Sequence, residues 1–141
     1  MSKTRKIIND PVFGFLSIPD GVLFEILQHP YLQRLNRIRQ LGLSFFVYPG
    51  AMHSRFLHSL GAMHLMREAI GSLREKGVEV TDIEATASMA AILLHDVGHG
   101  PFSHVMEHTL VDGITHEEIS LMMMEKVKGG NEDLREVMDL A

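Results

Sequence analysis

An apolar run that leads directly into two metal-ligand residue types is the strongest restriction on how this chain folds. Five apolar residues, 90–94, are followed at once by His95 and Asp96. Such a run is typical of a buried helix, so the side chains at its end lie near the interior. An imidazole beside a carboxylate suits borderline and hard divalent cations such as manganese, iron, zinc or magnesium. The pattern therefore predicts a buried helix that ends at a metal site.

A second block with a potential metal ligand lies upstream, in residues 55–61. Its sequence, RFLHSLG, places His58 in another apolar and helical pattern, so two helices can deliver ligands to one point. The chain contains no cysteine, which excludes disulfides and thiolate ligands. Any metal must therefore rest on nitrogen and oxygen donors. The two blocks together indicate a metal site more strongly than either does alone.

The composition is that of one soluble domain. The chain has 141 residues, 45% of them hydrophobic, which is enough to bury one core. Its longest uncharged apolar run, 85–94, is about half of the ~20 residues that a membrane helix needs. The N-terminal residues lack the apolar core of a secretion signal. We therefore expect a single cytoplasmic domain with no membrane partner.

The charge is unevenly distributed but forms no track for nucleic acid. Residues 1–74 carry nine Lys or Arg and four Asp or Glu, whereas residues 75–141 carry four and fourteen, so the halves are +5 and −10. A modestly basic first half can attract polyphosphates. It has no dense basic stripe with interleaved aromatic residues, which is the usual footprint of nucleic-acid binding. We therefore do not expect nucleic acid as the principal ligand.

The expected fold is all-α, a helical bundle with a minor N-terminal β-hairpin. Two extended segments, 7–8 and 12–18, flank an Asp-Pro turn and predict the hairpin. Capping boxes of the form Thr-x-x-Glu begin at Thr81 and Thr115, and a loop or short strand is expected over 44–50. Apolar spacing and helix-stop residues predict helices over 20–29, 31–41, 54–76, 81–95, 115–128 and 131–140.

Eight short motifs occur in one order along most of the chain. They are Asn9-Asp10-Pro11, Gln33-Arg34-Leu35, Arg39-Gln40-Leu41-Gly42, Tyr48-Pro49-Gly50-Ala51, His53-Ser54-Arg55-Phe56, His58-Ser59-Leu60-Gly61, the segment from His95 to His104, and His116-Glu117. In these motifs and in their order, the chain resembles the HD-domain phosphohydrolases. Within that family it is most similar to the deoxynucleoside triphosphate triphosphohydrolases of the SAM-and-HD-domain kind. The resemblance implies an HD-domain helical bundle that holds a divalent metal ion.

The resemblance also assigns metal ligands and phosphate-binding side chains. It implies that His58, His95 and Asp96 bind the ion, which the sequence does not narrow beyond manganese, iron, magnesium, zinc, nickel or cobalt. It places Arg55 against a substrate phosphate and His104 in the lining of the same pocket. Because Arg55 precedes His58 by three residues, the two share one face of a helix.

Three further residues are candidates for catalysis. Glycines on both sides of His99 argue against a continued helix, so we expect a turn that lifts its imidazole toward the ligands. In the family that the chain resembles, this histidine acts beside the metal, as an acid or electrostatic partner of the phosphate. His116 and Glu117 match a pair in which the histidine shuttles a proton and the carboxylate orients it. The implied reaction converts a deoxynucleoside triphosphate to deoxynucleoside and triphosphate.

The chain departs from the family at the last metal ligand. The family closes its site with a second aspartate on a much later helix, and no aspartate after His104 lies in a comparable apolar stretch. We therefore expect residues 1–141 to be the N-terminal part of a single HD domain, with three of four protein ligands. Missing later helices would leave apolar surface exposed, which favours homo-oligomers.

Two alternatives remain open from the sequence. The metal-ligand block is shared across HD enzymes, so the substrate is a nucleotide or another phosphorylated small molecule, and a nucleotidase or phosphodiesterase is a second hypothesis. A non-catalytic helical module that binds a nucleotide or a partner helix is a third, favoured by the missing aspartate. Nucleotide-activated relatives recognise guanine with an acidic residue and an arginine where this chain has Gln28 and Asn36. Guanine activation through that same site is therefore not expected.

Overall fold

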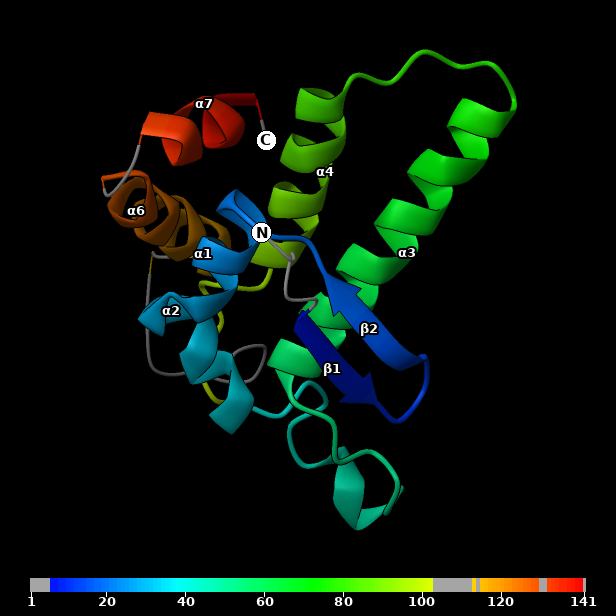
Figure 1. Cartoon of the computed structure of the whole chain (residues 1–141). Coiled ribbons are helices and arrows are strands. Elements are labelled where there is room, and N and C mark those ends of the chain that lie inside the picture. Colours follow the sequence, from blue (N-terminus) through cyan, green and yellow to red (C-terminus); the bar gives the residue numbers. More distant parts are fainter. Residues whose placement is uncertain (1–5, 103–112, 114, 130–131, 141) are drawn as a thin grey trace.

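The computed structural model describes residues 6–102, 113, 115–129 and 132–140. Over these residues the predicted all-α class with one antiparallel hairpin is confirmed (Figure 1). The helices are α1 (Val22–Gln28), α2 (Pro30–Gln33), α3 (Arg55–Glu75), α4 (Asp82–Leu94), α6 (His116–Lys128) and α7 (Glu132–Leu140). Two short 3-10 helices, Arg34–Arg37 and Ser44–Phe46, lie between α2 and α3. No helix in this part of the chain is both long and apolar enough to cross a membrane.

The N-terminal hairpin consists of β1 (Lys6–Asp10) and β2 (Gly14–Ile18). The carboxylate of Asp10 accepts hydrogen bonds from the backbone N–H groups of Val12 (2.8 Å) and Phe13 (2.9 Å), and these bonds shape the turn. This is the local hydrogen bonding for which aspartate is favoured in turns. Two alternate side chains of β2, Leu16 and Ile18, are buried in the core and anchor the hairpin to the helices. The hairpin lies beside α3 (Figure 1).

The helix predicted over 31–41 is wrong in its second half. After α2 and the following 3-10 helix the chain becomes extended at Ile38, whose carbonyl accepts a 2.8 Å hydrogen bond from the backbone N–H of Arg55. That N–H belongs to the first turn of α3, where no partner exists within the helix. Ile38 is buried by this pairing while Leu41 is exposed, so the apolar spacing was not that of a single helix face.

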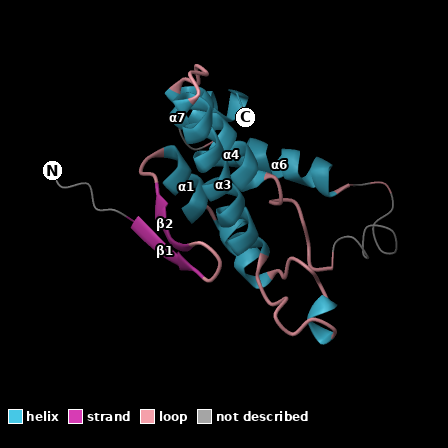
Figure 2. Ribbon diagram, turned by 90° about the vertical axis from the view of Figure 1, so that its right-hand side faces the viewer, coloured by secondary structure: helices cyan, strands magenta, loops and turns pink. Residues whose placement is uncertain are grey.

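The core lies mainly between α3 and α4, which pack side by side and run in opposite directions (Figure 1). α4 begins at the predicted capping box, in which the Thr81 side chain and the Glu84 carboxylate each accept the other residue's backbone N–H. α7 packs against α4, and α6 lies beside α7 (Figure 2). Because α3 and α4 are antiparallel, the first turn of α3 meets the last turn of α4 at one end of the bundle.

Candidate metal centre

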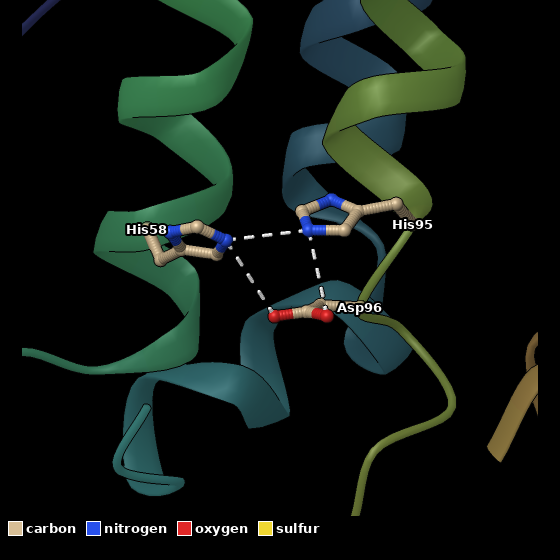
Figure 3. Close-up of side chains that lie close together, drawn as sticks. All are labelled: His58, His95 and Asp96. Carbon is tan, nitrogen blue, oxygen red and sulfur yellow. Dashed lines mark hydrogen bonds and ion pairs between the residues drawn. The ribbon is translucent and has the colours of Figure 1, made fainter. Parts of the chain in front are cut away.

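The first turns of α3 and the end of α4 supply three side chains that point toward one another (Figure 3). α3 begins where the Ser54 side chain accepts a 3.2 Å hydrogen bond from the Leu57 N–H, and His58 follows one turn later. His95 is the C-terminal cap of α4, and Asp96 comes directly after it. The two antiparallel helices therefore bring residues that are 37 or more positions apart to one point.

The ligand atoms are separated by distances that fit a single cation. The two Nε2 atoms of His58 and His95 are 3.3 Å apart, and His95 Nε2 is 3.4 Å from Asp96 Oδ1. His58 Nε2 lies 3.9 Å from Asp96 Oδ2. Metal–ligand bonds of about 2.1 Å place neighbouring ligand atoms roughly 3.0–3.5 Å apart in octahedral or tetrahedral sites. A small inward movement of His58 satisfies this spacing, so the nitrogen and oxygen donors fit a divalent ion.

The surroundings of His58 and His95 favour the protonation states in which an imidazole can bind a metal. His95 Nδ1 lies 2.6 Å from the carbonyl oxygen of Ile92, which can only accept, so Nδ1 carries the proton and the Nε2 lone pair faces the cluster. Burial lowers the pKa of His58 below its ordinary value, and this outweighs the attraction of the Asp96 carboxylate. The neutral imidazole, which is the form that binds a metal, is therefore favoured.

Asp96 is the most enclosed member of the cluster, and Arg55 is its ion-pair partner. Arg55 Nη1 donates a 2.9 Å hydrogen bond to Asp96 Oδ2, and both side chains are buried. Burial alone opposes ionisation of Asp96, but the nearby charges of His95 and Arg55 outweigh it and hold the pKa of this carboxyl below its usual value. Arg55 and His58 lie on one face of α3, as predicted. Both side chains lie near the same carboxylate oxygen, Oδ2 of Asp96.

The candidate catalytic histidines also lie together. Residues 97–99 form a turn instead of a continued helix, and His99 Nδ1 is 3.4 Å from Asp96 Oδ1. The ring of His99 packs against that of His116, the first residue of α6, with centroids 4.0 Å apart. Glu117 is exposed, with its Oε1 3.8 Å from His116 Nε2. His104 lies outside the described residues.

A cleft borders the cluster at His95. It has a volume of about 360 Å³ and is lined by Met66, Ser88, Ala91, Ile92, His95 and Leu140. His95 is exposed at its edge, and the side chain of His58 is only partly covered. Catalytic metal sites keep such an open position, whereas structural sites are closed by protein ligands.

Two residues that hold the turn at 97–99, Arg34 and Ser120, were missed from the sequence as contributors to the site. Arg34 Nη2 donates to the Val97 carbonyl, and Ser120 Oγ accepts a 2.9 Å hydrogen bond from the Gly98 N–H. Arg34 and Ser120 are far from this turn in the sequence, so no local pattern links them to it. Gly98 offered the one signal, because a glycine between two candidate functional residues often marks a close backbone approach.

Comparison with known proteins supports the family resemblance that the sequence motifs indicated. The family model described as HD domain matches residues 55–141. The deoxynucleoside triphosphate triphosphohydrolase SAMHD1 of Bos taurus is 38% identical over 96% of this chain and 24% of its own length. The uncharacterized protein YwfO of Bacillus subtilis is 38% identical over 82% of this chain and 26% of its own length.

A solved structure is similar over nearly the whole chain. It is a phosphohydrolase from Bacteroides thetaiotaomicron, 63% identical, with a TM-score of 0.89. The match covers 94% of this chain and 33% of that one. The chain therefore spans about a quarter of the length of the curated relatives just described and a third of this solved structure.

Proposed function

Because the chain belongs to the HD-domain family, we propose that it provides the metal-binding part of a phosphohydrolase. The observation that carries this proposal is the convergence of His58, His95 and Asp96 from two helices onto one point. The 2.6 Å contact between His95 Nδ1 and Ile92 supports it, because this contact leaves Nε2 of His95 for a metal.

A divalent ion bound by these three side chains supplies Lewis-acid chemistry, since it neutralises charge on a phosphate oxygen and lowers the pKa of water. Arg55 holds the Asp96 carboxylate in a fixed orientation, and we assign to it the further role of binding a substrate phosphate. His104 is the second candidate for phosphate binding. Both residues act on the substrate before any bond is broken.

Proton transfer to the leaving oxygen is assigned to the stacked histidines. His99 lies beside Asp96, so its imidazole is close to the phosphate that the cluster would hold. The ring of His116 lies against that of His99, so a second imidazole is close to the site of proton transfer, and Glu117 orients His116 from the exposed side. His99, His116 and Glu117 are therefore the proposed acid–base residues.

For the substrate we propose a deoxynucleoside triphosphate, cleaved to deoxynucleoside and triphosphate. The support is the similarity to SAMHD1 triphosphohydrolases over nearly the whole chain. The runner-up is hydrolysis of another phosphorylated metabolite, because a metal ion held by this cluster would act on the phosphate group and not on the base or sugar. A non-catalytic binding module is favoured by one observation: among the described residues the cluster has three protein ligands, not four.

We further propose that the chain self-associates and that a carboxylate from a later helix completes the site. The segment 41–52 carries strongly exposed apolar side chains, including Phe46, Val47 and Tyr48. Apolar groups gathered on one segment favour burial against another surface. The side chains of His58 and His95 are partly exposed, so a further ligand can reach the cluster from solvent.

Product identification tests the activity. The chain, and a version extended at its C-terminus to include the later helix, are incubated with Mn²⁺ and a panel of nucleoside triphosphates, and the products are identified by mass spectrometry. Deoxynucleoside with intact triphosphate supports the proposal. Turnover only of phosphomonoesters or cyclic nucleotides moves the assignment to the runner-up, and no turnover with retained nucleotide binding supports the non-catalytic module.

Calorimetric titration with Mn²⁺ tests the metal site separately. We expect His58→Ala to weaken Mn²⁺ binding at least tenfold, since it removes a direct ligand. His64→Ala is the matched control: His64 is on the same helix, contacts Arg67 through Nδ1 and lies outside the cluster. Equal binding by both variants refutes the proposed ligand set.

A further inference from the structure

The peptide unit that joins Val97 to Gly98 is held at both of its polar groups by side chains from other elements. Its carbonyl accepts a hydrogen bond from Nη2 of Arg34, in the 3-10 helix after α2. Its N–H donates a 2.9 Å hydrogen bond to Oγ of Ser120, in α6. The plane of this peptide is therefore fixed from two directions.

This peptide lies in a buried environment, where water cannot replace a lost partner. Val97, Gly98 and His99 are all buried, and so is Ser120. A buried amide or carbonyl without a hydrogen-bond partner is strongly unfavourable, so the turn holds this conformation only while both partners are present.

Gly98 lets the turn lie directly on the first turn of α6. A Cβ atom at this position would be 2.2 Å from the carbonyl oxygen of His116 and 2.4 Å from Ser120 Oγ. No real Cβ approaches other atoms so closely, so only glycine fits here. This close approach brings the His99 ring onto the His116 ring, with centroids 4.0 Å apart.

We propose that Arg34 and Ser120 are positioning residues that hold His99 against both Asp96 and His116. Two residues, Val97 and Gly98, separate the metal-ligand residue Asp96 from His99, and the clamped peptide joins these two residues. Rotation of its plane moves the His99 imidazole relative to Asp96. This inference rests on the proposed function, in which His99 and His116 carry the proton.

The first test compares Ser120→Ala with Ser59→Ala. Ser59 is as buried as Ser120, and its hydroxyl makes no hydrogen bond to a described residue, so it controls for loss of a buried hydroxyl. NMR of each variant measures the exchange rate of the Gly98 amide and the nuclear Overhauser contacts between His99 and His116. We expect faster exchange and weakened ring contacts in Ser120→Ala only.

Kinetics and metal binding test the positioning role. For Ser120→Ala we expect kcat to fall about ten- to hundredfold, because a small displacement of a reacting group has effects of this size. KM and Mn²⁺ affinity should change less than about twofold, because His58, His95 and Asp96 are not held by this hydroxyl. A variant that merely lost stability would not separate kcat from KM and metal affinity in this way.

Arg34 provides a second variant in case Ser120→Ala does not fold. Arg34→Met removes the donor to Val97, and Arg34→Lys keeps a donor, so lysine should restore part of the kcat that methionine loses. Unchanged ring contacts in both Ser120→Ala and Arg34→Met overturn the inference, as does an equal kcat loss in Ser59→Ala. Failure of both the wild-type chain and its C-terminally extended version to turn over any substrate refutes the proposed function instead, and the NMR contacts then decide whether the clamp holds His99.

Discussion

Replacing Arg55 by methionine removes one partner of a buried ion pair while keeping a long side chain. The Arg55 and Asp96 side chains are only 4% and 8% exposed, and their charged atoms are 2.9 Å apart. Without Arg55, the Asp96 carboxylate remains in a poorly solvated position beside the imidazoles of His58, His95 and His99. Loss of one member of such a pair costs about 3–5 kcal/mol. We expect a loss of unfolding free energy of this size in the absence of metal.

An exposed pair with the same geometry provides the control. Arg74 Nη2 and Asp82 Oδ1 are also 2.9 Å apart, but these side chains are 40% and 98% exposed. Exposed pairs contribute about 0–1 kcal/mol, so Arg74→Met should lower stability by no more than this. The difference between the variants mainly reflects burial, since the charged groups and their distance are alike. Arg74 Nε also donates a 3.0 Å hydrogen bond to the Val80 carbonyl, so any stability lost in Arg74→Met is an upper limit for its ion pair.

Urea unfolding followed by circular dichroism measures both variants, with and without Mn²⁺. Saturating Mn²⁺ should recover part of the loss in Arg55→Met, because a bound cation compensates the same carboxylate and binds only the folded chain. The pKa of Asp96 is lowered in the folded protein, so its stabilisation is present above the ordinary carboxyl pKa and is lost as the pH falls through the folded value. The deficit of Arg55→Met should therefore shrink in acid.

The reasoning is refuted if the two methionine variants lose equal stability at neutral pH. A deficit in Arg55→Met that grows in acid also contradicts it, because protonated Asp96 no longer needs a cation. Arg55→Lys, which keeps the charge but not the planar donor group, should lie between the wild type and Arg55→Met.

Three further predictions concern backbone packing and helix capping. Gly98→Ala should destabilise the chain by at least about 2 kcal/mol in urea unfolding, because its Cβ would meet the His116 carbonyl, whereas Gly100→Ala, with open space, should not. Thr81→Ala should cost about 1 kcal/mol in the same assay, because it removes the N-terminal cap of α4. Hydrogen bonds from Thr81 lower the pKa of Glu84, so the stabilisation by this carboxylate is present above the ordinary carboxyl pKa and is lost as the pH falls through the lower folded value. Glu84→Gln should remove that pH dependence from acid-unfolding curves.

Short-range patterns in the sequence were sufficient for most of the helices and for the choice of candidate site residues, although they extended one helix too far past residue 37. Thr81 and Thr115 cap α4 and α6 as predicted, because a capping box involves residues only three positions apart. His95 and Asp96 end a buried helix as predicted, because burial of an apolar run follows from its composition. The family resemblance is confirmed by the HD-domain match over residues 55–141.

Contacts between distant residues could not be predicted in this way. Ile38 leaves the helical pattern because its carbonyl pairs with the backbone of Arg55, a partner that its local sequence does not reveal. The same holds for the Arg34 and Ser120 bonds to the turn at 97–99. Spacing along the chain encodes helix faces and caps, whereas the meeting of two elements depends on how the whole core packs. The candidate ligand residues could therefore be chosen from the sequence, but the short distances between His58, His95 and Asp96 arise from the antiparallel packing of α3 and α4.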